Sequence, residues 1–196
     1  MKELLLATTN NGKRKELFHL IGDRFEILLP TDLGLEMKVE ETGTTFAENA
    51  VLKAESLGKL SGKMTFADDS GLEIDAMGGE PGIYSSRFGG ENSTYPEKFA
   101  LIYDRLKDVP FEKRTARFRC AIALYIPGEE TRVFEGKVEG IIANEPKGTN
   151  GFGYDPIFFV PEYGKCMAEL DPDIKNQISH RANAIKLLVE YLNTRF

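Results

Sequence analysis

Two adjacent carboxylates, Asp68 and Asp69, are the side chains of this sequence that point most directly to chemistry. Adjacent carboxylates repel each other, so a site that keeps both usually shares a cation or moves a proton. The pair is followed by Ser70 and Gly71, and Asp-Asp-Ser-Gly is also common turn composition. A metal or acid–base site and an Asx-type turn therefore both remain open at this point.

A second polar group lies near the N-terminus, where Thr8, Asn10 and Lys13 follow a short apolar run and precede an amphipathic segment. A loop between a strand and a helix presents backbone N–H groups to an anion. The segment is not a P-loop, because Ala7 and Arg14 occupy positions where that motif needs glycine and a hydroxyl. The simpler alternative is a capped helix with an exposed lysine.

A glycine-dense loop at 147–156 holds two aromatic residues, Phe152 and Tyr154, between glycines. Because they stand outside any periodic pattern, they are poor candidates for the core. Aromatic rings in such loops suit stacking on a flat ligand.

Ser179 is a suitable N-cap for the last helix, which places His180 and Arg181 in its first turn beside free N–H groups. Arginine there is unfavourable for the helix dipole, which hints at a role beyond helix formation. The alternatives are an ordinary exposed helix start and a phosphate site at the helix N-terminus.

These groups need a scaffold, and the apolar periodicity predicts an α/β one. The runs around Asp68 and Asp69 place the pair at a strand end or in a tight turn. A capping box, Thr45 with Glu48, begins a helix on which Lys53 is expected at the solvated rim. We expect strands at 4–7, 25–29, 37–39, 64–67, 72–74, 115–126, 131–143 and 157–160, and helices at 15–21 and from 46, 94 and 180. Strand–helix units at the N-terminus and a long hairpin at 115–143 together predict a mixed sheet with flanking helices.

The composition is that of one soluble domain, residues 1–196, drawn out into two lobes. A net charge of −6 argues against a general nucleic-acid or membrane-surface binder. No apolar run approaches the ~20 residues that a membrane span requires. Cys120 and Cys166 are expected to be reduced thiols of a cytoplasmic protein. With only two histidines, any metal is expected to be held by oxygen, which indicates magnesium or manganese.

Several motifs occur in one order between residues 8 and 181. They are Thr8-x-Asn10-x-x-Lys13, Glu41-Thr42-Gly43, Phe46-x-Glu48-Asn49-Ala50, Lys53, the run 66–72, the run 151–156, and Lys175-Asn176-x-x-Ser179-His180-Arg181. Together they resemble the inosine triphosphate pyrophosphatase family. The resemblance implies cleavage of non-standard purine triphosphates (ITP, dITP, XTP) to monophosphate and pyrophosphate, which removes deaminated purines from the nucleotide pool. It also implies Mg²⁺, a homodimer, and an elongated α/β fold with two lobes around a central active-site cleft.

The resemblance also implies a role for each matching residue. Phosphates would be held by Thr8, Asn10, Lys13, Lys53 and Ser70; the metal by Glu41 and Asp69; catalysis by Asp69 with Asp68; and the base by Phe152, Gly153, Tyr154, Asp155, Lys175, His180 and Arg181. A one-residue shift would exchange Glu41 for Glu40, and the sequence does not separate Asp68 and Asp69 into base and ligand.

Base selection has a physical basis, because hypoxanthine and xanthine carry a 6-oxo acceptor where adenine has an amino donor. Donors from His180, Arg181 and backbone N–H groups would be left unpaired by adenine. Two alternatives remain: a pyrophosphatase acting on modified pyrimidine nucleotides, and a nucleotide sensor that binds without turnover. The pocket expected from His180, Arg181 and residues 152–155 counts against the first, and Glu41 with Asp69 counts against the second.

Overall fold

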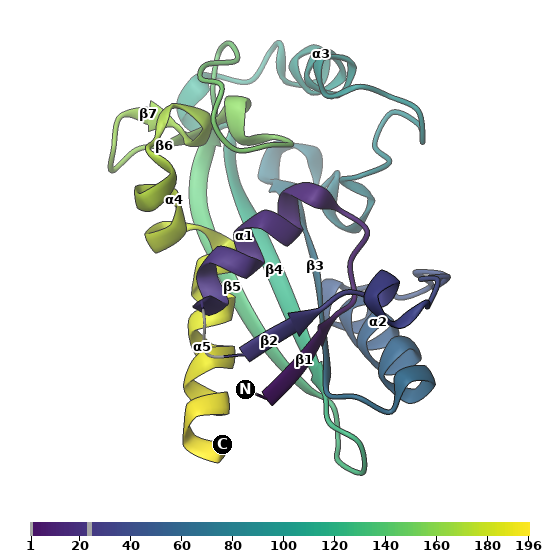
Figure 1. Cartoon of the computed structure of the whole chain (residues 1–196). Helices are drawn as coiled ribbons and strands as arrows, with labels where there is room; N and C mark the ends of the chain where they lie inside the picture. Colours follow the sequence, from purple (N-terminus) through teal and green to yellow (C-terminus); the bar gives the residue numbers. More distant parts are fainter. Residues whose placement is uncertain (1, 23–24) are drawn as a thin grey trace. The chain divides into compact units, whose positions relative to one another are not determined.

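The computed structural model describes residues 2–22 and 25–196 (Figure 1). Its strands are β1 (Lys2–Leu6), β2 (Phe25–Leu28), β3 (Thr65–Ile74), β4 (Thr115–Tyr125), β5 (Arg132–Ile142), β6 (Phe158–Val160) and β7 (Lys165–Cys166). Its α-helices are α1 (Asn11–Ile21), α2 (Phe46–Ser61), α3 (Tyr95–Leu106), α4 (Pro172–Ile178) and α5 (His180–Arg195). Short 3-10 helices lie in several of the connections.

The described strands form a seven-stranded sheet in the order β2-β1-β3-β4-β5-β6-β7. Strand β1 is parallel to both β2 and β3, whereas β6 is antiparallel to both β5 and β7. The neighbouring strands β4 and β5 are joined by a short turn and correspond to the predicted hairpin. The predicted mixed α/β fold is therefore confirmed.

The chain forms two compact units, each made of several segments. Unit 1 comprises the described residues of 1–69, 120–136 and 180–196, and unit 2 comprises 70–119 and 137–179. Strands β3, β4 and β5 each contribute residues to both units. The assignment of 1–196 to a single domain stays a prediction.

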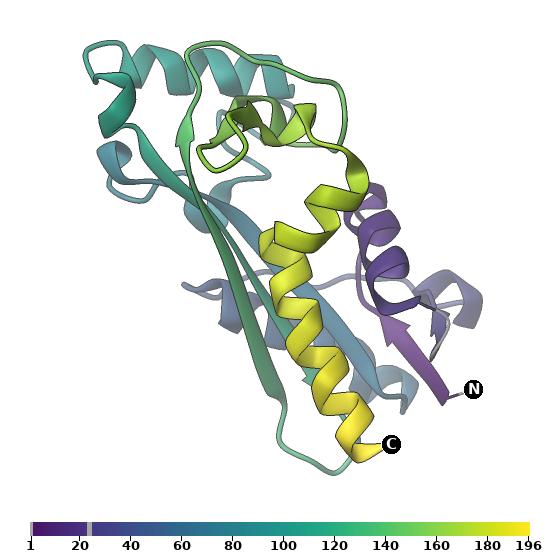
Figure 2. The ribbon, with the colours of Figure 1, turned by 90° about the vertical axis from the view of Figure 1, so that its left-hand side faces the viewer.

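In unit 1, helices α1 and α5 lie on one face of the strands and α2 lies on the other (Figures 1 and 2). Alternate side chains of a strand point to opposite faces, which explains how one strand serves both helix layers. The core under α1 and α5 is formed by Leu4, Leu6, Leu17, Ile21, Phe66, Cys120, Ile122, Leu124, Ile185, Leu188 and Leu192, among others. Beneath α2, Gly58 allows close approach, since a Cβ there would come within 2.1 Å of the Tyr125 ring.

The core of unit 2 lies between α3 and the strands. Leu72 and Ile74 of β3 and Phe118 of β4 pack with Phe99 and Ile102 of α3. The helix expected from 94 is thus confirmed, and its apolar side chains lie in the core.

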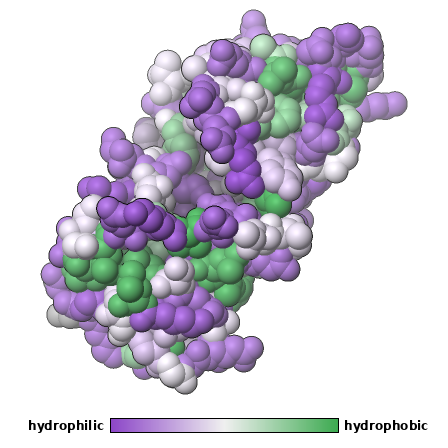
Figure 3. Space-filling model, turned by 90° about the vertical axis from the view of Figure 1, so that its right-hand side faces the viewer, coloured by the Kyte–Doolittle hydropathy of each residue, from purple (hydrophilic) through white to green (hydrophobic). Residues whose placement is uncertain are grey.

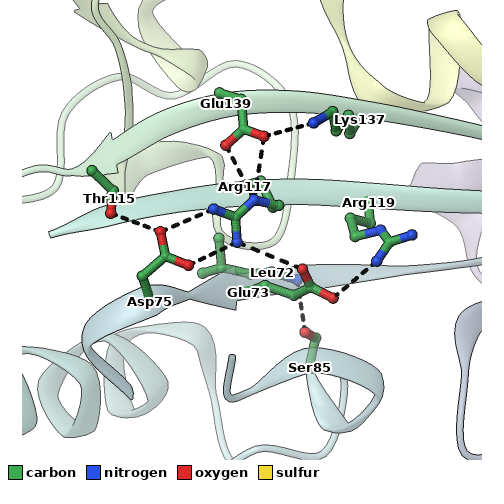
Figure 4. A network of polar contacts seen from close by, with 9 residues as sticks. All are labelled: Leu72, Glu73, Asp75, Ser85, Thr115, Arg117, Arg119, Lys137 and Glu139. Carbon is green, nitrogen blue, oxygen red and sulfur yellow. Dashed lines mark hydrogen bonds and ion pairs between the residues drawn. The ribbon is translucent and has the colours of Figure 1, made fainter. Parts of the chain in front are cut away.

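The opposite face of β3–β5 in unit 2 is charged (Figure 4). Arg117 on β4 bonds to Asp75 at 2.9 Å and to Glu139 on β5 at 3.1 Å. Thr115 donates to Asp75 at 2.7 Å, and Arg119 lies 3.7 Å from Glu73. Opposite charges on neighbouring strands therefore stabilise a sheet face that the unit 2 core does not cover.

Side-chain caps fix the starts of three helices, and α1 begins at Asn11, four residues before the start of the helix expected at 15–21. Asn10 caps α1 by accepting from the backbone N–H of Lys13, and Thr94 with Glu97 forms a complete capping box on α3. At α2 the box is only half formed. Thr45 accepts from the N–H of Glu48, but the carboxylate of Glu48 bonds to Thr44 instead.

Two sequence predictions are wrong. Residues 37–39 form no strand, because this extended segment joins no ladder of the sheet. Asp68 and Asp69 lie inside the ten-residue strand β3, not at a strand end or in a turn. Gly71 does not adopt a positive φ, so no reversal of the chain occurs there.

In unit 1, the surface on the side of α2 carries apolar side chains (Figure 3). The outer surface of α2 contributes Leu52 and Leu60, and Leu60 is 64% exposed. In the described part of the chain, no helix is both long and apolar enough to cross a membrane.

Candidate active site

Asp68 and Asp69 are neighbours on β3, so their side chains point to opposite faces of the sheet and contact different helices. Phe66 belongs to the core under α1 and α5, and Asp68, two residues later, meets side chains from the same two helices. Asp69 points the other way, toward α2, where it meets Lys53. The two neighbouring aspartates therefore belong to two different groups of ion pairs.

Asp68 is held by cations from both helices. Its side chain is fully buried, and its Oδ2 lies 3.1 Å from Lys13 Nζ and 3.3 Å from both Nε and Nη2 of Arg181. Burial alone would raise the pKa of Asp68, but the charges of Lys13, Arg181 and Lys53 outweigh it and hold the pKa well below its ordinary value. Arg181 also forms an ion pair with Glu16 of α1. Asp68 is thus a permanent carboxylate in this environment.

Asp69 has a different environment. Its Oδ1 accepts from Lys53 Nζ at 2.9 Å, while its Oδ2 is buried and forms no hydrogen bond with any described residue. Burial raises the pKa of Asp69, and the attraction of Lys53 and Lys13 only partly offsets this. A buried carboxylate oxygen without a partner is costly in a structural role. Asp69 therefore has the properties of a group that meets a ligand, a metal or a proton.

Glu41 completes this group, because its Oε1 lies 3.5 Å from Lys53 Nζ. Glu40, the alternative left open by the sequence, is exposed. Lys53 itself is only 6% exposed, so its expected place at a solvated helix rim is wrong. The described residues include no cluster of three or more His, Cys, Asp or Glu that could enclose a metal without other ligands.

The N-terminus of α1 carries the predicted polar loop. Thr8 Oγ1 accepts from the N–H of Asn10 at 3.2 Å, and Asn10 Oδ1 accepts from the N–H of Lys13 at 3.0 Å. Both side chains therefore order the loop, and Lys13 keeps a partly exposed ammonium group beside Asp68. The alternative of a capped helix with an exposed lysine is therefore correct for the cap, which Asn10 forms, and wrong for Lys13, which is only partly exposed.

In unit 2, Asp155 organises the second predicted group. Its Oδ2 accepts from the backbone N–H of Phe152 at 2.9 Å and from Lys175 Nζ at 2.5 Å, and Asp155 and Lys175 are buried. Lys175 Nζ lies 5.0 Å from the centre of the Phe152 ring. A Cβ at Gly151 would come within 2.1 Å of Asp155 Oδ2, so only glycine fits. The carboxylate of Asp155 and the ammonium group of Lys175 thus hold the half-buried Phe152 in position.

Tyr154 is buried, so the prediction that both loop aromatics are poor core candidates is wrong for this residue. Its ring is 5% exposed and lies in the unit 2 core. Its hydroxyl donates to the backbone carbonyl of Ser85 at 2.7 Å. Phe152, by contrast, is half-buried.

The remaining predicted residues lie in three different places of the chain. Ser70 is half-buried on β3, and Gly153 adopts φ +66° beside the ring of Tyr95. His180 and Arg181 begin α5 as predicted, but both are buried, so the alternative of an exposed helix start is wrong.

Two residues of these groups were missed by sequence reasoning. Glu16 stands three residues after Lys13, and helical spacing places both on one face of α1. That spacing could have indicated Glu16 as a partner of a cation near Lys13. Tyr95 gave no such signal, because its spacing predicts only a helix start.

Comparison with known proteins gives a consistent result. A model of the Ham1 family matches residues 4–191. The chain is 51% identical over 193 residues to a dITP/XTP pyrophosphatase of Bacillus subtilis, covering 98% of each chain. It is 48% identical to a protein of the same name from Bacillus licheniformis, covering 98% of this chain and 99% of the relative.

A solved structure gives the same match in three dimensions. The Ham1 protein of Staphylococcus aureus superposes with a TM-score of 0.91 at 45% identity, covering all of both chains.

Proposed function

Because this chain belongs to the Ham1 family, we propose that it hydrolyses non-standard purine nucleoside triphosphates such as ITP, dITP and XTP. The products are the monophosphate and pyrophosphate. The resemblance found in the sequence motifs is confirmed by the family match and by the relatives. The assignment to particular residues rests on Asp69, whose Oδ2 is buried among cations and has no hydrogen-bond partner among the residues that the structure describes.

The unit 1 group supplies phosphate binding. Lys13 and Lys53 offer ammonium groups, and the start of α1 adds backbone N–H groups and the positive end of a helix dipole. Thr8 and Asn10 order this loop, and Ser70 follows directly on β3. Such an arrangement favours a polyanion in a protein whose overall charge is −6.

Asp69 acts as the general base. Attack by water at the α-phosphorus forms a new P–O bond and breaks the bond to the bridging oxygen, so pyrophosphate leaves. The water proton passes to the carboxylate of Asp69, whose raised pKa favours accepting it. Asp68, held ionised by Lys13 and Arg181, fixes the position of these cations and accepts no proton.

The donor set fits a divalent cation of the Mg²⁺ type. Asp69 provides a buried carboxylate oxygen to which no residue in the described part of the chain donates, and the partly exposed carboxylate of Glu41 lies beside the same Lys53. Oxygen ligands of this kind suit Mg²⁺, which usually keeps several waters and binds through one or two carboxylates together with substrate phosphates. When bound, the ion would neutralise charge on the triphosphate.

The unit 2 group recognises the base. Phe152, held by Asp155 and Lys175, offers a ring for stacking, and Gly153 leaves backbone accessible beside it. The family resemblance also implies His180 and Arg181 as donors for the 6-oxo group, and Arg181 already donates to Asp68 and Glu16. An unpaired buried donor facing adenine would cost about 1–3 kcal/mol.

We further propose that the enzyme is a cytoplasmic homodimer. The free, buried thiols of Cys120 and Cys166 are compatible with a reducing compartment. A sedimentation experiment would test the dimer.

The function is tested with a panel of ITP, dITP, XTP, GTP, ATP and a modified pyrimidine triphosphate in the presence of Mg²⁺. We expect pyrophosphate release from the first three and little from the others. Orthophosphate as the direct product, or equal rates with ATP and ITP, would contradict the proposal. Binding without turnover would favour a sensor.

A further inference from the structure

Tyr95, the first residue of α3, lies beside the loop that we assign to base recognition. A Cβ atom at Gly153 would be 3.5 Å from the hydroxyl oxygen of Tyr95, and its next nearest contacts would be carbons of the same ring. The Tyr95 ring packs edge-on against Tyr154, with centroids 5.3 Å apart, and tilted against Phe99 at 6.2 Å. The ring is therefore held in place, with its hydroxyl at the glycine of the loop.

The hydroxyl of Tyr95 differs from those of the two neighbouring tyrosines of unit 2. Tyr154 uses its hydroxyl to bond the carbonyl of Ser85, and Tyr103 has a hydroxyl that is buried away from solvent. Tyr95 is half-buried, and its hydroxyl forms no hydrogen bond with any residue that the structure describes. It can therefore bond a ligand without breaking a protein contact.

The chemistry of this phenol favours donation. Burial, with a smaller effect from the charge of Asp155, raises the pKa of Tyr95, so the hydroxyl keeps its proton at neutral pH. The start of α3 is anchored, since the buried Lys98 donates to the carbonyl of Phe88 at 2.9 Å. A protonated phenol on a fixed helix start is a preorganised donor.

We propose that Tyr95 is a further specificity-determining residue, whose hydroxyl donates a hydrogen bond to an oxo group of the substrate purine. The inference rests on the proposed function, because it requires the base to lie at the Phe152–Asp155 loop. Hypoxanthine and xanthine offer oxo acceptors to this donor. Adenine has an amino group at position 6 and no oxo group, so it gains nothing from Tyr95.

The test is Tyr95→Phe in the full chain, which keeps the ring packing and removes the hydroxyl alone. With ITP and XTP the KM should rise about 3- to 10-fold, the range expected for one hydrogen bond, while kcat stays within about twofold. With ATP neither constant should change, so discrimination falls by the same factor. Binding of IMP, measured by calorimetry, should weaken in parallel.

Tyr103→Phe is the matched control, because it removes a buried hydroxyl from the same helix, eight residues after Tyr95. It should leave all constants and IMP binding unchanged. An unchanged KM in Tyr95→Phe, an equal loss with ATP, or the same change in Tyr103→Phe would overturn the proposal. Absence of pyrophosphate release from ITP by the unmodified enzyme would instead overturn the proposed function.

Discussion

Replacing Arg181 by methionine should destabilise unit 1 strongly, because it removes a buried cation from two carboxylates. The Arg181 side chain is 2% exposed and the Asp68 side chain is 0% exposed. Breaking a buried ion pair typically costs about 3–5 kcal/mol. Since Asp68 keeps Lys13 at 3.1 Å, we expect the lower end of this range, about 3 kcal/mol.

The assay is urea unfolding of wild type, Arg181→Met, Asp68→Asn and the double variant at neutral pH. The double variant should be more stable than the sum of the single losses predicts, with a coupling of about 2 kcal/mol. Arg195→Met is the control, because Arg195 lies on the same helix and pairs with Glu129 at the surface. That exposed pair should contribute less than about 1 kcal/mol.

The pH dependence follows from the direction of the shift. The pKa of Asp68 is lower in the folded chain than in the unfolded chain, so its stabilising contribution is present above the ordinary carboxyl pKa. This contribution is lost as the pH falls toward the folded value. The difference between wild type and Arg181→Met should therefore shrink in acid. Additive losses, or an equal effect of Arg195→Met, would refute the buried-cation reasoning.

Three further predictions follow from the two units. Asp69→Asn should abolish pyrophosphate release while triphosphate binding remains measurable by calorimetry; normal turnover would remove Asp69 from the mechanism. Phe152→Ala should raise the KM for ITP about 5- to 150-fold, since one stacking contact contributes about 1–3 kcal/mol, and an unchanged KM would argue against stacking. Arg117→Ala should lower the melting temperature modestly, and less so at high salt. The hydrogen bond from Arg117 lowers the pKa of Asp75, so this stabilisation should fade as the pH falls through the folded pKa of Asp75; a loss of stability independent of pH would contradict that pairing.

Local sequence signals predicted much of the fold. Capping residues placed the starts of α2, α3 and α5, and alternation with a central turn placed the hairpin of β4 and β5. These signals suffice because they act within a few residues. The strand expected at 37–39 failed because an extended segment needs a partner strand, which its own residues do not specify.

The site was harder to predict, because its contacts join distant residues. Arg181 and Asp68 stand 113 positions apart, and nothing in either motif indicates that they pair. Lys53 was expected at a solvated rim, but it is buried because its ammonium group pairs with Asp69 on β3, which offsets the loss of hydration. Tyr154 has no periodic neighbours, so its place in the core depends on α3 and on the carbonyl of Ser85.

The proposed function depends most on Asp69 and Glu41 holding a divalent ion against the triphosphate. The direct measurement is Mn²⁺ binding, followed by electron paramagnetic resonance, in the presence of a non-hydrolysable ITP analogue. Wild type and Glu40→Gln should bind the ion alike, while Glu41→Gln and Asp69→Asn should lose most of the binding. Unchanged binding in Asp69→Asn, or loss in Glu40→Gln with retention in Glu41→Gln, would contradict the assignment.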